Sequence, residues 1–299
     1  AIGATLNEDV STIKDLVSQE GDWSGIHLNM RTKCVSLAQK AVDKTNESWS
    51  RRHQWTWRKF AAHIGLLFWA WGILELPMAE FFPVLRFVSE KGRMLTEHPE
   101  LWDQQAVIWN SVWPALQRWT ELVLRNQPRR VPVDEEPQLL IATDASAYGW
   151  GYVAVNTVTG QVYVHGEPWS HAMRRYHGAR IGQSTFSEPQ GIRAALCHLL
   201  TLDMPRRIRV ATDSTVSVAS YNRGFNTHSH HINDCLMKCK QLFGDHFDMD
   251  FVHIEGATNP SDGVSRGVNA SEVDRELAAE VLRRVVGGAQ ASFPNYHPV

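Results

Sequence analysis

The sequence changes character at a short run rich in proline and charge, residues 126–138. This run, NQPRRVPVDEEPQ, holds three prolines and five charged side chains, a composition typical of an extended connection rather than of a core element. Ten of the 12 tryptophans lie before Gln138 and two lie after it. We therefore predict a linker over 126–138 that divides the chain into two domains, residues 1–132 and residues 133–299.

The overall composition excludes several classes of protein. Of the 299 residues, 43% are apolar, and the formal net charge is −2, so the chain is globular and has no global basic field. Its four cysteines form no C-x-x-C pair, which excludes a disulfide-rich secreted scaffold. We expect an intracellular location, in the cytoplasm or the nucleus. The apolar stretch 60–74 is shorter than the ~20 residues of a membrane span, so we predict a buried helix there and no membrane association.

The first domain is predicted to be mainly helical. Apolar residues at helical spacing predict helices over 32–45, 57–76 and 101–124. The short alternating segment 25–30 predicts a strand or a hairpin. Large aromatic side chains dominate burial, so we interpret the tryptophans of 55–71 mainly as core residues rather than as a surface that stacks on nucleotides.

The second domain alternates strands and helices. Short apolar runs predict five strands, of which the first three form an antiparallel meander, over 139–143, 150–155, 161–165, 207–212 and 248–254. Helical spacing predicts four helices, over 188–202, 214–221, 230–243 and 271–286. This order predicts an α/β fold with a mixed five-stranded sheet and helices on both faces.

Four carboxylates fall at the ends of these predicted elements. Asp144 and Asp213 each follow a strand, whereas Glu188 begins a helix and Asp262 follows the last strand. Any one of them alone is better explained as a turn residue or a helix cap. Together they would repel one another at one sheet edge unless a cation lay between them.

An all-oxygen cluster of this kind suits Mg²⁺, for which Mn²⁺ can substitute. Two such ions ~3.5–4 Å apart support in-line attack of water on a phosphodiester. The sequence therefore predicts a two-metal centre that Asp144, Glu188, Asp213 and Asp262 hold and that performs the catalysis.

Several other polar side chains are candidates for a zinc site or for nucleic-acid contacts. The histidines near 228–231 suggest zinc together with Cys235 and Cys239, but both thiols lie in an apolar helical stripe and are better explained as core residues. Basic and amide side chains in three segments are candidates for nucleic-acid contacts, and a solvated surface explains them about equally well. These candidates are Arg174, Arg175 and Arg180 in a predicted loop, Asn222 and Arg223 after a helix, and Arg58 and Lys59 at a helix start.

The motifs around the four carboxylates, taken in order, resemble those of ribonuclease H. They are IATDAS at Asp144, FSE at Glu188, VATDST at Asp213 and NPSDGVSR at Asp262. The ending of residues 253–266, H-x-x-G-x-x-N-x-x-D-x-x-S-R, is similar to that of retroelement ribonucleases H. The segment DSTVSVASYNRG that starts at Asp213 resembles the version in tyrosine-recombinase retroelements of the DIRS and VIPER types.

The first domain is similar to another part of such reverse transcriptases. The segment 55–67 resembles the thumb helix that follows the polymerase palm, and 25–45 resembles the strand, turn and helix after the polymerase site. The chain holds no Y-x-D-D box, so the polymerase site is absent from it. The resemblance implies a thumb/connection region followed by a ribonuclease H domain, with an upstream palm and fingers as a partner in the parent protein.

The resemblance also implies an activity and roles for the carboxylates. The activity is metal-dependent endonucleolytic cleavage of the RNA strand in RNA–DNA hybrids. Asp144 would contact both ions, Glu188 and Asp213 one of them, and Asp262 the other. Cellular ribonucleases H carry a histidine just after the glycine that ends the last strand, where this chain has Ala257. His253 lies earlier, on the strand, where we expect a packed or hydrogen-bonded side chain without a catalytic role.

Two alternative functions stay open. One is a nuclease on the same fold that acts on DNA, because a shared fold does not determine the substrate. The other is a non-catalytic nucleic-acid-binding or architectural module derived from a retroelement, for which a lost carboxylate would be the expected sign, and all four are present.

Overall fold

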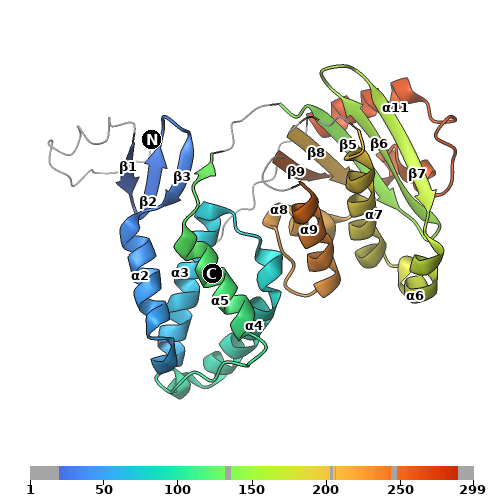
Figure 1. Ribbon diagram of the computed structural model, residues 1–299. Helices are drawn as coiled ribbons and strands as arrows, with labels where there is room; N and C mark the ends of the chain where they lie inside the picture. The colour runs from blue at the N-terminus through green and yellow to red at the C-terminus, as the bar shows by residue number, and fades with distance from the viewer. Residues whose placement is uncertain (1–19, 132–135, 203–204, 206, 244–247, 289–299) are drawn as a thin grey trace. The chain divides into compact units, whose positions relative to one another are not determined.

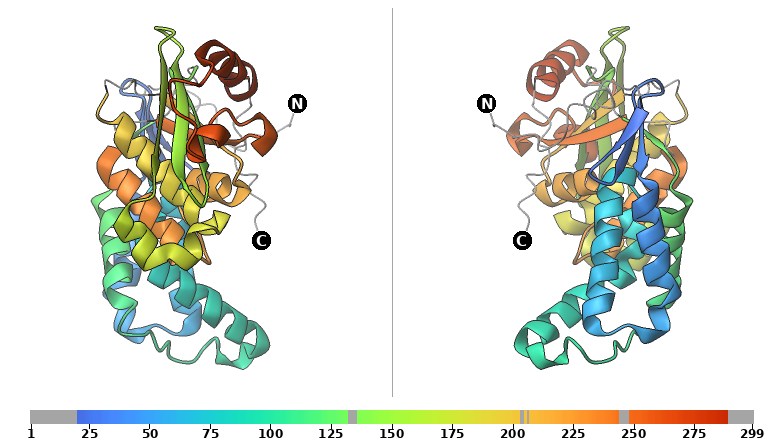
Figure 2. Two further views of the ribbon diagram at one scale, coloured as in Figure 1. Left: turned by 90° about the vertical axis from the view of Figure 1, so that its right-hand side faces the viewer. Right: turned by 90° about the vertical axis from the view of Figure 1, so that its left-hand side faces the viewer.

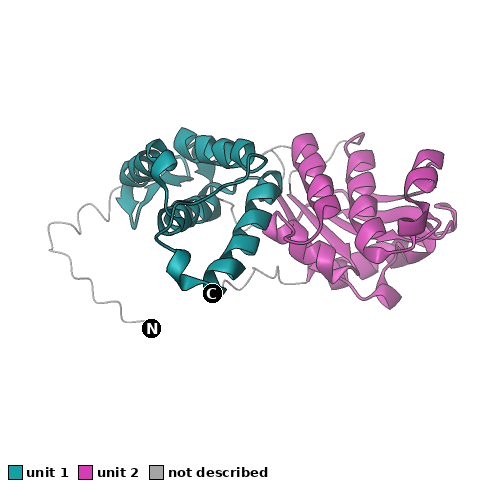
Figure 3. Ribbon diagram, turned by 90° about the horizontal axis from the view of Figure 1, so that it is seen from below, with its two compact units in different colours: residues 1–133 teal, residues 134–299 magenta. Residues whose placement is uncertain are grey.

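The computed structural model describes residues 20–131, 136–202, 205, 207–243 and 248–288. The chain divides into two compact units, residues 1–133 and residues 134–299 (Figure 3). Each unit has its own sheet. No helix among the described residues is long and apolar enough to cross a membrane.

The first unit begins with a small antiparallel sheet. Its four strands lie in the order β1-β2-β3-β4 and span Glu20–Trp23, Ile26–Asn29, Cys34–Leu37 and Arg129–Arg130. The hairpin predicted over 25–30 is confirmed as part of it, whereas the helix predicted from residue 32 is wrong over its first turns. Val35 and Leu37 are buried there as strand residues, because β2 supplies hydrogen-bonding partners that a local helical pattern does not reveal.

Four α-helices lie within the described part of the first unit. They are α2 (Gln39–Ser50), α3 (Trp57–Leu74), α4 (Phe82–Glu97) and α5 (Trp113–Arg125). The prediction of α3 is confirmed, α4 was not predicted, and the helix predicted over 101–124 begins only at Trp113. Pro114 explains this start, because proline is suited to the first turn of a helix and not to its interior.

The core between these helices is aromatic. The fully buried Trp119 ring stacks on Phe81 at a centroid distance of 5.0 Å. His63 is also fully buried, and its ring nitrogens lie 3.1 Å from Ser48 Oγ and 3.2 Å from Thr120 Oγ1. Burial lowers the pKa of His63 to about 4, so this histidine is neutral at physiological pH. The aromatic cluster therefore has a packing role.

The segment 126–131 is more ordered than a linker. Asn126 ends α5 in a left-handed conformation, and its side chain accepts from the backbone N–H of Leu37 and donates to the carbonyl of Leu37, both at 2.8 Å. Arg129 and Arg130 then pair with β3 as strand β4. This stretch therefore ties α5 to the small sheet, and residues 132–135 of the predicted linker lie outside the described residues.

The second unit contains the predicted mixed sheet (Figure 1). Its strands lie in the order β7-β6-β5-β8-β9, with β5 antiparallel to β6 and parallel to β8. The pair β6–β7 is antiparallel and the pair β8–β9 parallel. The five strands are β5 (Leu139–Ala145), β6 (Gly149–Asn156), β7 (Val162–Pro168), β8 (Arg207–Thr212) and β9 (Asp248–His253).

Helices cover both faces of this sheet (Figure 2). On one face, α7 (Ser184–Leu199) packs on β5 and β6, and α8 (Thr215–Arg223) packs on β8 and β9. Helix α9 (His230–Phe243) packs against α7, and α6 (His171–Ile181) precedes these helices. The other face buries an aliphatic cluster that includes Leu140, Val153, Val252, Val264 and Leu282. The elements over that cluster are α10 (Asp262–Ser265), α11 (Arg275–Val281) and the π-helical turn Leu282–Gly287.

Two predictions in this unit need correction. The segment with the three arginines is a helix, α6, and not a loop. The last helix begins at Arg275 rather than near residue 271, because the Asp274 side chain accepts hydrogen bonds from the backbone N–H groups of Glu276 and Leu277 and caps it.

Candidate metal centre

Three of the four predicted carboxylates meet at one edge of the five-stranded sheet. Asp144 is the next-to-last residue of β5, within the strand rather than after it, and Asp213 directly follows the parallel neighbour β8. Glu188 reaches the same edge from the second turn of α7, not from the first turn as predicted. One carboxylate oxygen of each residue lies within 4.8 Å of those of the other two.

Glu188 is held by two neighbouring strands, β5 and β8. It is 4% exposed, and its two oxygens accept hydrogen bonds from the Ala145 N–H and the Thr212 hydroxyl, both at 3.2 Å. Burial raises its pKa to about 8, and the neighbouring charges of Asp144 and Asp213 act in the same direction. Without a cation, Glu188 is therefore mainly protonated at neutral pH.

The close approach of α7 to β5 depends on Gly191. A Cβ atom at this position would lie 2.9 Å from the Ala145 Cβ, a distance at which one of the two would have to move. The glycine therefore lets the helix bring Glu188 over the end of β5.

Asp144 receives a hydrogen bond that sequence reasoning missed. The buried Ser265 hydroxyl donates to its Oδ2 atom. Burial raises the pKa of Asp144, and the hydrogen bond from Ser265 opposes that change. Nearby, the buried Asn259 amide donates to the Thr143 carbonyl at 3.0 Å. Ser265 and Asn259 both belong to the ending motif of residues 253–266, which is the signal that could have indicated them.

Asp213 is half-buried and lies beside the same ending segment. A Cβ atom at Gly256 would lie 3.1 Å from Asp213 Oδ2. The glycine thus leaves room for this carboxylate next to the loop that follows β9.

Asp262 is not part of the three-residue group. It is the first residue of α10, and its carboxylate accepts three hydrogen bonds of 2.8–3.1 Å from the Arg266 guanidinium. The ion pair is largely exposed. Asp262 therefore faces an arginine in this structure, whereas the other three carboxylates face one another.

The residues of this centre fit a hard divalent cation. All donors are carboxylate oxygens, and two of the three residues are buried. Burial and the neighbouring carboxylates raise the pKa values of Asp144 and Glu188, a change that a bound cation would oppose. Within the described ranges, it is the one group of three or more acidic, histidine or cysteine side chains close enough to share an ion. Asp144, Glu188 and Asp213 would hold that ion.

The zinc hypothesis for the α9 thiols is not supported by their surroundings. Cys235 and Cys239 are 0% and 5% exposed, and burial raises the pKa of each to about 12. Among the described residues, neither thiol belongs to a group of three or more side chains close enough to share an ion. Both cysteines are core residues, as predicted.

The predicted nucleic-acid contacts lie in different surroundings. Arg58 pairs with Asp103 on the surface of the first unit, near the exposed Lys59. The Asn222 amide bonds to both the N–H and the carbonyl of Phe251 in β9, so its polar atoms are already used within the fold. All five candidate arginines lie over aromatic rings, Arg58 over Trp102, Arg174 over Tyr148, Arg175 over Tyr176, Arg180 over Phe186 and Arg223 over Phe225.

His253 is the last residue of β9, and its side chain is exposed. The expectation of a packed side chain at this position is therefore wrong. The strand alternates, and Val252 rather than His253 turns into the aliphatic cluster.

Comparison with known proteins gives matches among solved structures alone. No protein-family model and no curated protein sequence matches the chain. The chain is similar to the crystal structure of RNase H1 from the halophilic archaeon Halobacterium salinarum NRC-1, with 15% sequence identity and a TM-score of 0.32. This match covers 40% of this chain and 86% of that chain. It is also similar to an RNase H1 isolated from compost by a metagenomic approach, with 17% identity, 49% and 96% covered, and a TM-score of 0.32.

A third match covers more of this chain at a lower TM-score. The foamy viral protease-reverse transcriptase dRH in complex with double-stranded DNA is 12% identical, and the match covers 79% of this chain with a TM-score of 0.28. The chain spans 38% of the length of that protein.

The second unit has a ribonuclease H-like fold. We assign it from the strand order β7-β6-β5-β8-β9, from the single parallel run β5-β8-β9, and from the helices on both faces. The helical first unit and its small antiparallel sheet precede it.

Proposed function

We propose that the chain is an endonuclease that hydrolyses the RNA strand of RNA–DNA hybrids as part of a retroelement reverse transcriptase. The observation that carries this proposal is the approach of Asp144, Glu188 and Asp213 to within 4.8 Å at one edge of a ribonuclease H-like sheet. The resemblance of the segment DSTVSVASYNRG, which starts at Asp213, supports a retroelement of the DIRS and VIPER type as the source. The first unit would be its thumb/connection region and residues 133–299 the ribonuclease H domain.

The residues of the centre have distinct roles in this proposal. When bound, two Mg²⁺ ions supply positive charge at the scissile phosphate and lower the pKa of the attacking water. Asp144, fixed by Ser265, would contact both ions, and Glu188 and Asp213 would hold one of them. Asp262 would hold the other after it leaves Arg266. Glu188 must also lose its proton, because its pKa of about 8 leaves it mainly neutral without a cation.

Cleavage of defined substrates tests this proposal. The full chain is incubated with an RNA–DNA hybrid, double-stranded DNA and single-stranded RNA, in Mg²⁺, Mn²⁺, Ca²⁺ or excess chelator. We expect the RNA of the hybrid to be cut to 3′-hydroxyl and 5′-phosphate ends in Mg²⁺ or Mn²⁺, and no cutting in Ca²⁺ or chelator. Asp213→Asn should lower turnover by about three powers of ten or more, equivalent to roughly 4 kcal/mol of transition-state stabilisation.

A matched control separates loss of charge from loss of the centre. Asp234→Asn removes an equivalent charge from an exposed ion pair with Lys238 on α9 and should leave turnover unchanged. Cleavage of double-stranded DNA would favour the DNA-acting nuclease. Hybrid binding without cleavage in either metal would favour the non-catalytic module, and activity in excess chelator would contradict the metal mechanism.

A further inference from the structure

The helix α6 is unusually exposed for an element of a folded domain. Of its residues 171–181, Ile181 is buried and Met173 half-buried, and the others are exposed. The helix carries three arginines and two histidines and no acidic side chain, although the chain as a whole is close to neutral. It therefore presents a local positive surface that packing within the protein does not explain.

This surface lies at the same edge of the sheet as the metal centre. β7 ends at Pro168, which pairs with Gly149 at the start of β6, while Asp144 pairs with Gly151 two residues further along β6. The chain then forms α6 and continues directly into α7, which carries Glu188. Figure 1 shows α6 below the end of β7 and beside the start of α7.

Arg174 anchors α6 to the turn after Asp144. Its guanidinium donates from Nε to the Trp169 carbonyl at 3.1 Å and from Nη2 to the Tyr148 carbonyl at 3.2 Å. The buried Trp169 ring in turn donates from Nε1 to the Ser146 carbonyl at 2.8 Å. Arg174 therefore holds α6 against this turn, whereas the exposed Arg175 makes no such anchoring contact and lies over the exposed Tyr176 ring, 5.7 Å from its centroid.

The braced turn presents an aromatic side chain to solvent. Tyr148 is 48% exposed, and its backbone N–H donates to the Ser146 hydroxyl at 3.0 Å. That hydroxyl donates to the Ser265 carbonyl at 2.8 Å, so the turn is tied to the segment that holds Asp144. The Tyr148 ring packs against Gly267, where a Cβ atom would lie 3.0 Å from the ring, and the Arg174 guanidinium lies over the ring at 5.9 Å from its centroid. A ligand can therefore stack only on the part of the ring that these two neighbours leave exposed. An exposed aromatic ring held this firmly has little entropy to lose when a ligand stacks on it.

We propose that Tyr148 and the outward side of α6 form a binding surface for one strand of a nucleic acid, next to the metal centre. Arg175 contacts a backbone phosphate, and the Tyr148 ring stacks on a nucleotide. Charge complementarity favours this occupant, because the helix is basic throughout, and the combination of a cation with exposed aromatic rings is typical of surfaces that bind single strands. This inference rests on the proposed function and adds a specific contact surface to it.

Equilibrium binding of a fluorescent RNA–DNA hybrid tests the surface. Anisotropy is measured on the full chain in Ca²⁺, at several salt concentrations, for wild type, Arg175→Ala, Tyr148→Ala and Tyr148→Phe. Arg175→Ala should reduce the slope of log Kd against log salt concentration by about 0.9, the change expected for the loss of one phosphate contact. It should also weaken binding about tenfold at 0.1 M salt. Tyr148→Ala should weaken binding about fivefold or more at an unchanged salt dependence, and Tyr148→Phe should bind like wild type because the ring is kept.

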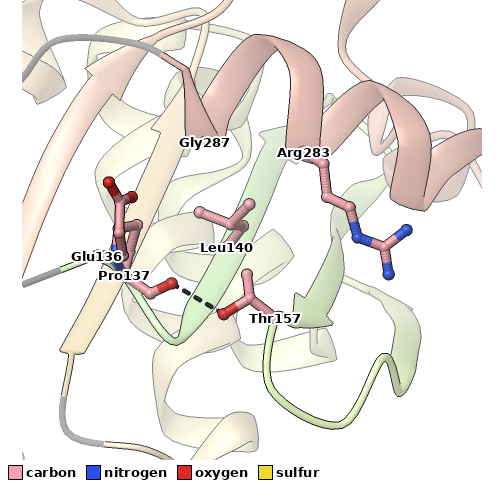
Figure 4. Close-up of a pocket in the computed structure, with 6 residues that line it drawn as sticks. All are labelled: Glu136, Pro137, Leu140, Thr157, Arg283 and Gly287. Carbon is pink, nitrogen blue, oxygen red and sulfur yellow. Dashed lines mark hydrogen bonds between the residues drawn. The ribbon is translucent and has the colours of Figure 1, made fainter.

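The control variant is Arg283→Ala. Arg283 is exposed in the π-helical turn and lines a pocket with Leu140 and Thr157 at the opposite end of β5 from Asp144 (Figure 4). It should bind the hybrid like wild type and with the same salt dependence. If Arg175→Ala and Tyr148→Ala equal this control, the surface is not a nucleic-acid site.

Two further outcomes distinguish this proposal from the proposed function. If the variants weaken binding as expected but the wild-type chain does not cleave the hybrid, the surface stands and the enzymatic proposal fails. If the wild-type chain binds no nucleic acid, or if Arg175→Ala abolishes self-association in sedimentation and leaves hybrid binding unchanged, the surface serves a protein contact and our inference is wrong.

Discussion

Glu188 makes the folded protein less stable as the pH rises, whereas a salt-bridged carboxylate makes a folded protein more stable as the pH rises. Its pKa is about 8 in the folded chain, chiefly because it is buried, against an ordinary value of 4.5. The folded state therefore binds one proton more than the unfolded state between these two pH values. The stabilisation is fully present below about pH 4.5 and is lost as the pH rises through 8.

The size of this effect follows from the two pKa values. One proton corresponds to about 1.4 kcal/mol of unfolding free energy per pH unit, and the whole interval to roughly 5 kcal/mol. Glu188→Gln removes the ionisation. Its side chain can still accept from the Ala145 N–H and meet the Thr212 hydroxyl. We expect the variant to gain roughly 2.5 kcal/mol of unfolding free energy relative to wild type between pH 5.5 and pH 7.5 when no metal is present.

Differential scanning calorimetry of the full chain in chelator, at pH 5.5, 6.5 and 7.5, measures the difference. The transition of the second unit is identified as the one that Mn²⁺ shifts in wild type. Mn²⁺ should also remove the loss of stability with rising pH, because the ion favours the ionised carboxylate. Glu280→Gln, at an exposed position of α11, is the control and should follow wild type. If Glu188→Gln keeps the pH dependence of wild type, Glu188 is ionised in the folded chain and our reasoning is refuted.

Three further predictions concern other parts of the chain. Residues 133–299 should fold alone with a cooperative thermal transition, because all five strands of the mixed sheet lie within them; a fragment unfolded under native conditions would show that the first unit is needed. His253→Ala should change turnover by less than about tenfold, below the ~10²–10⁴ expected of a general acid or base, and a larger loss in the cleavage assay would assign this exposed histidine to catalysis. Cys239, whose pKa burial raises to about 12, should resist iodoacetamide at pH 8 until denaturant is added, and rapid labelling of the native chain, followed by mass spectrometry, would contradict its burial.

Local sequence patterns predicted most of the second unit. The five strands and the helices α7, α8 and α9 lie close to their predicted ranges. Strands of four to eight apolar residues bounded by turn residues have few alternatives. The first unit was predicted less well, because β3 reads locally as part of a helical stripe and becomes a strand only through its pairing with β2. Residues 102–112 were also predicted as helix, because their local pattern does not reveal their tertiary contacts. Their carbonyl groups instead accept hydrogen bonds from the start of α3, Trp102 from the Arg58 N–H and Gln104 from the Trp57 N–H.

By itself, the sequence determined which residue types could form a metal centre and the order in which they occur. The tertiary structure decided which of those carboxylates lie together and which one pairs with an arginine instead. Glu188 meets Asp144 and Asp213 because β5 and β8 are parallel neighbours and α7 packs on β5, whereas Asp262 pairs with Arg266, the residue that follows its own short helix. Ser265 reaches Asp144 across 121 residues of sequence. Contacts of this range depend on the packing of separate elements, and a pattern read along the chain reports on neighbours a few residues apart.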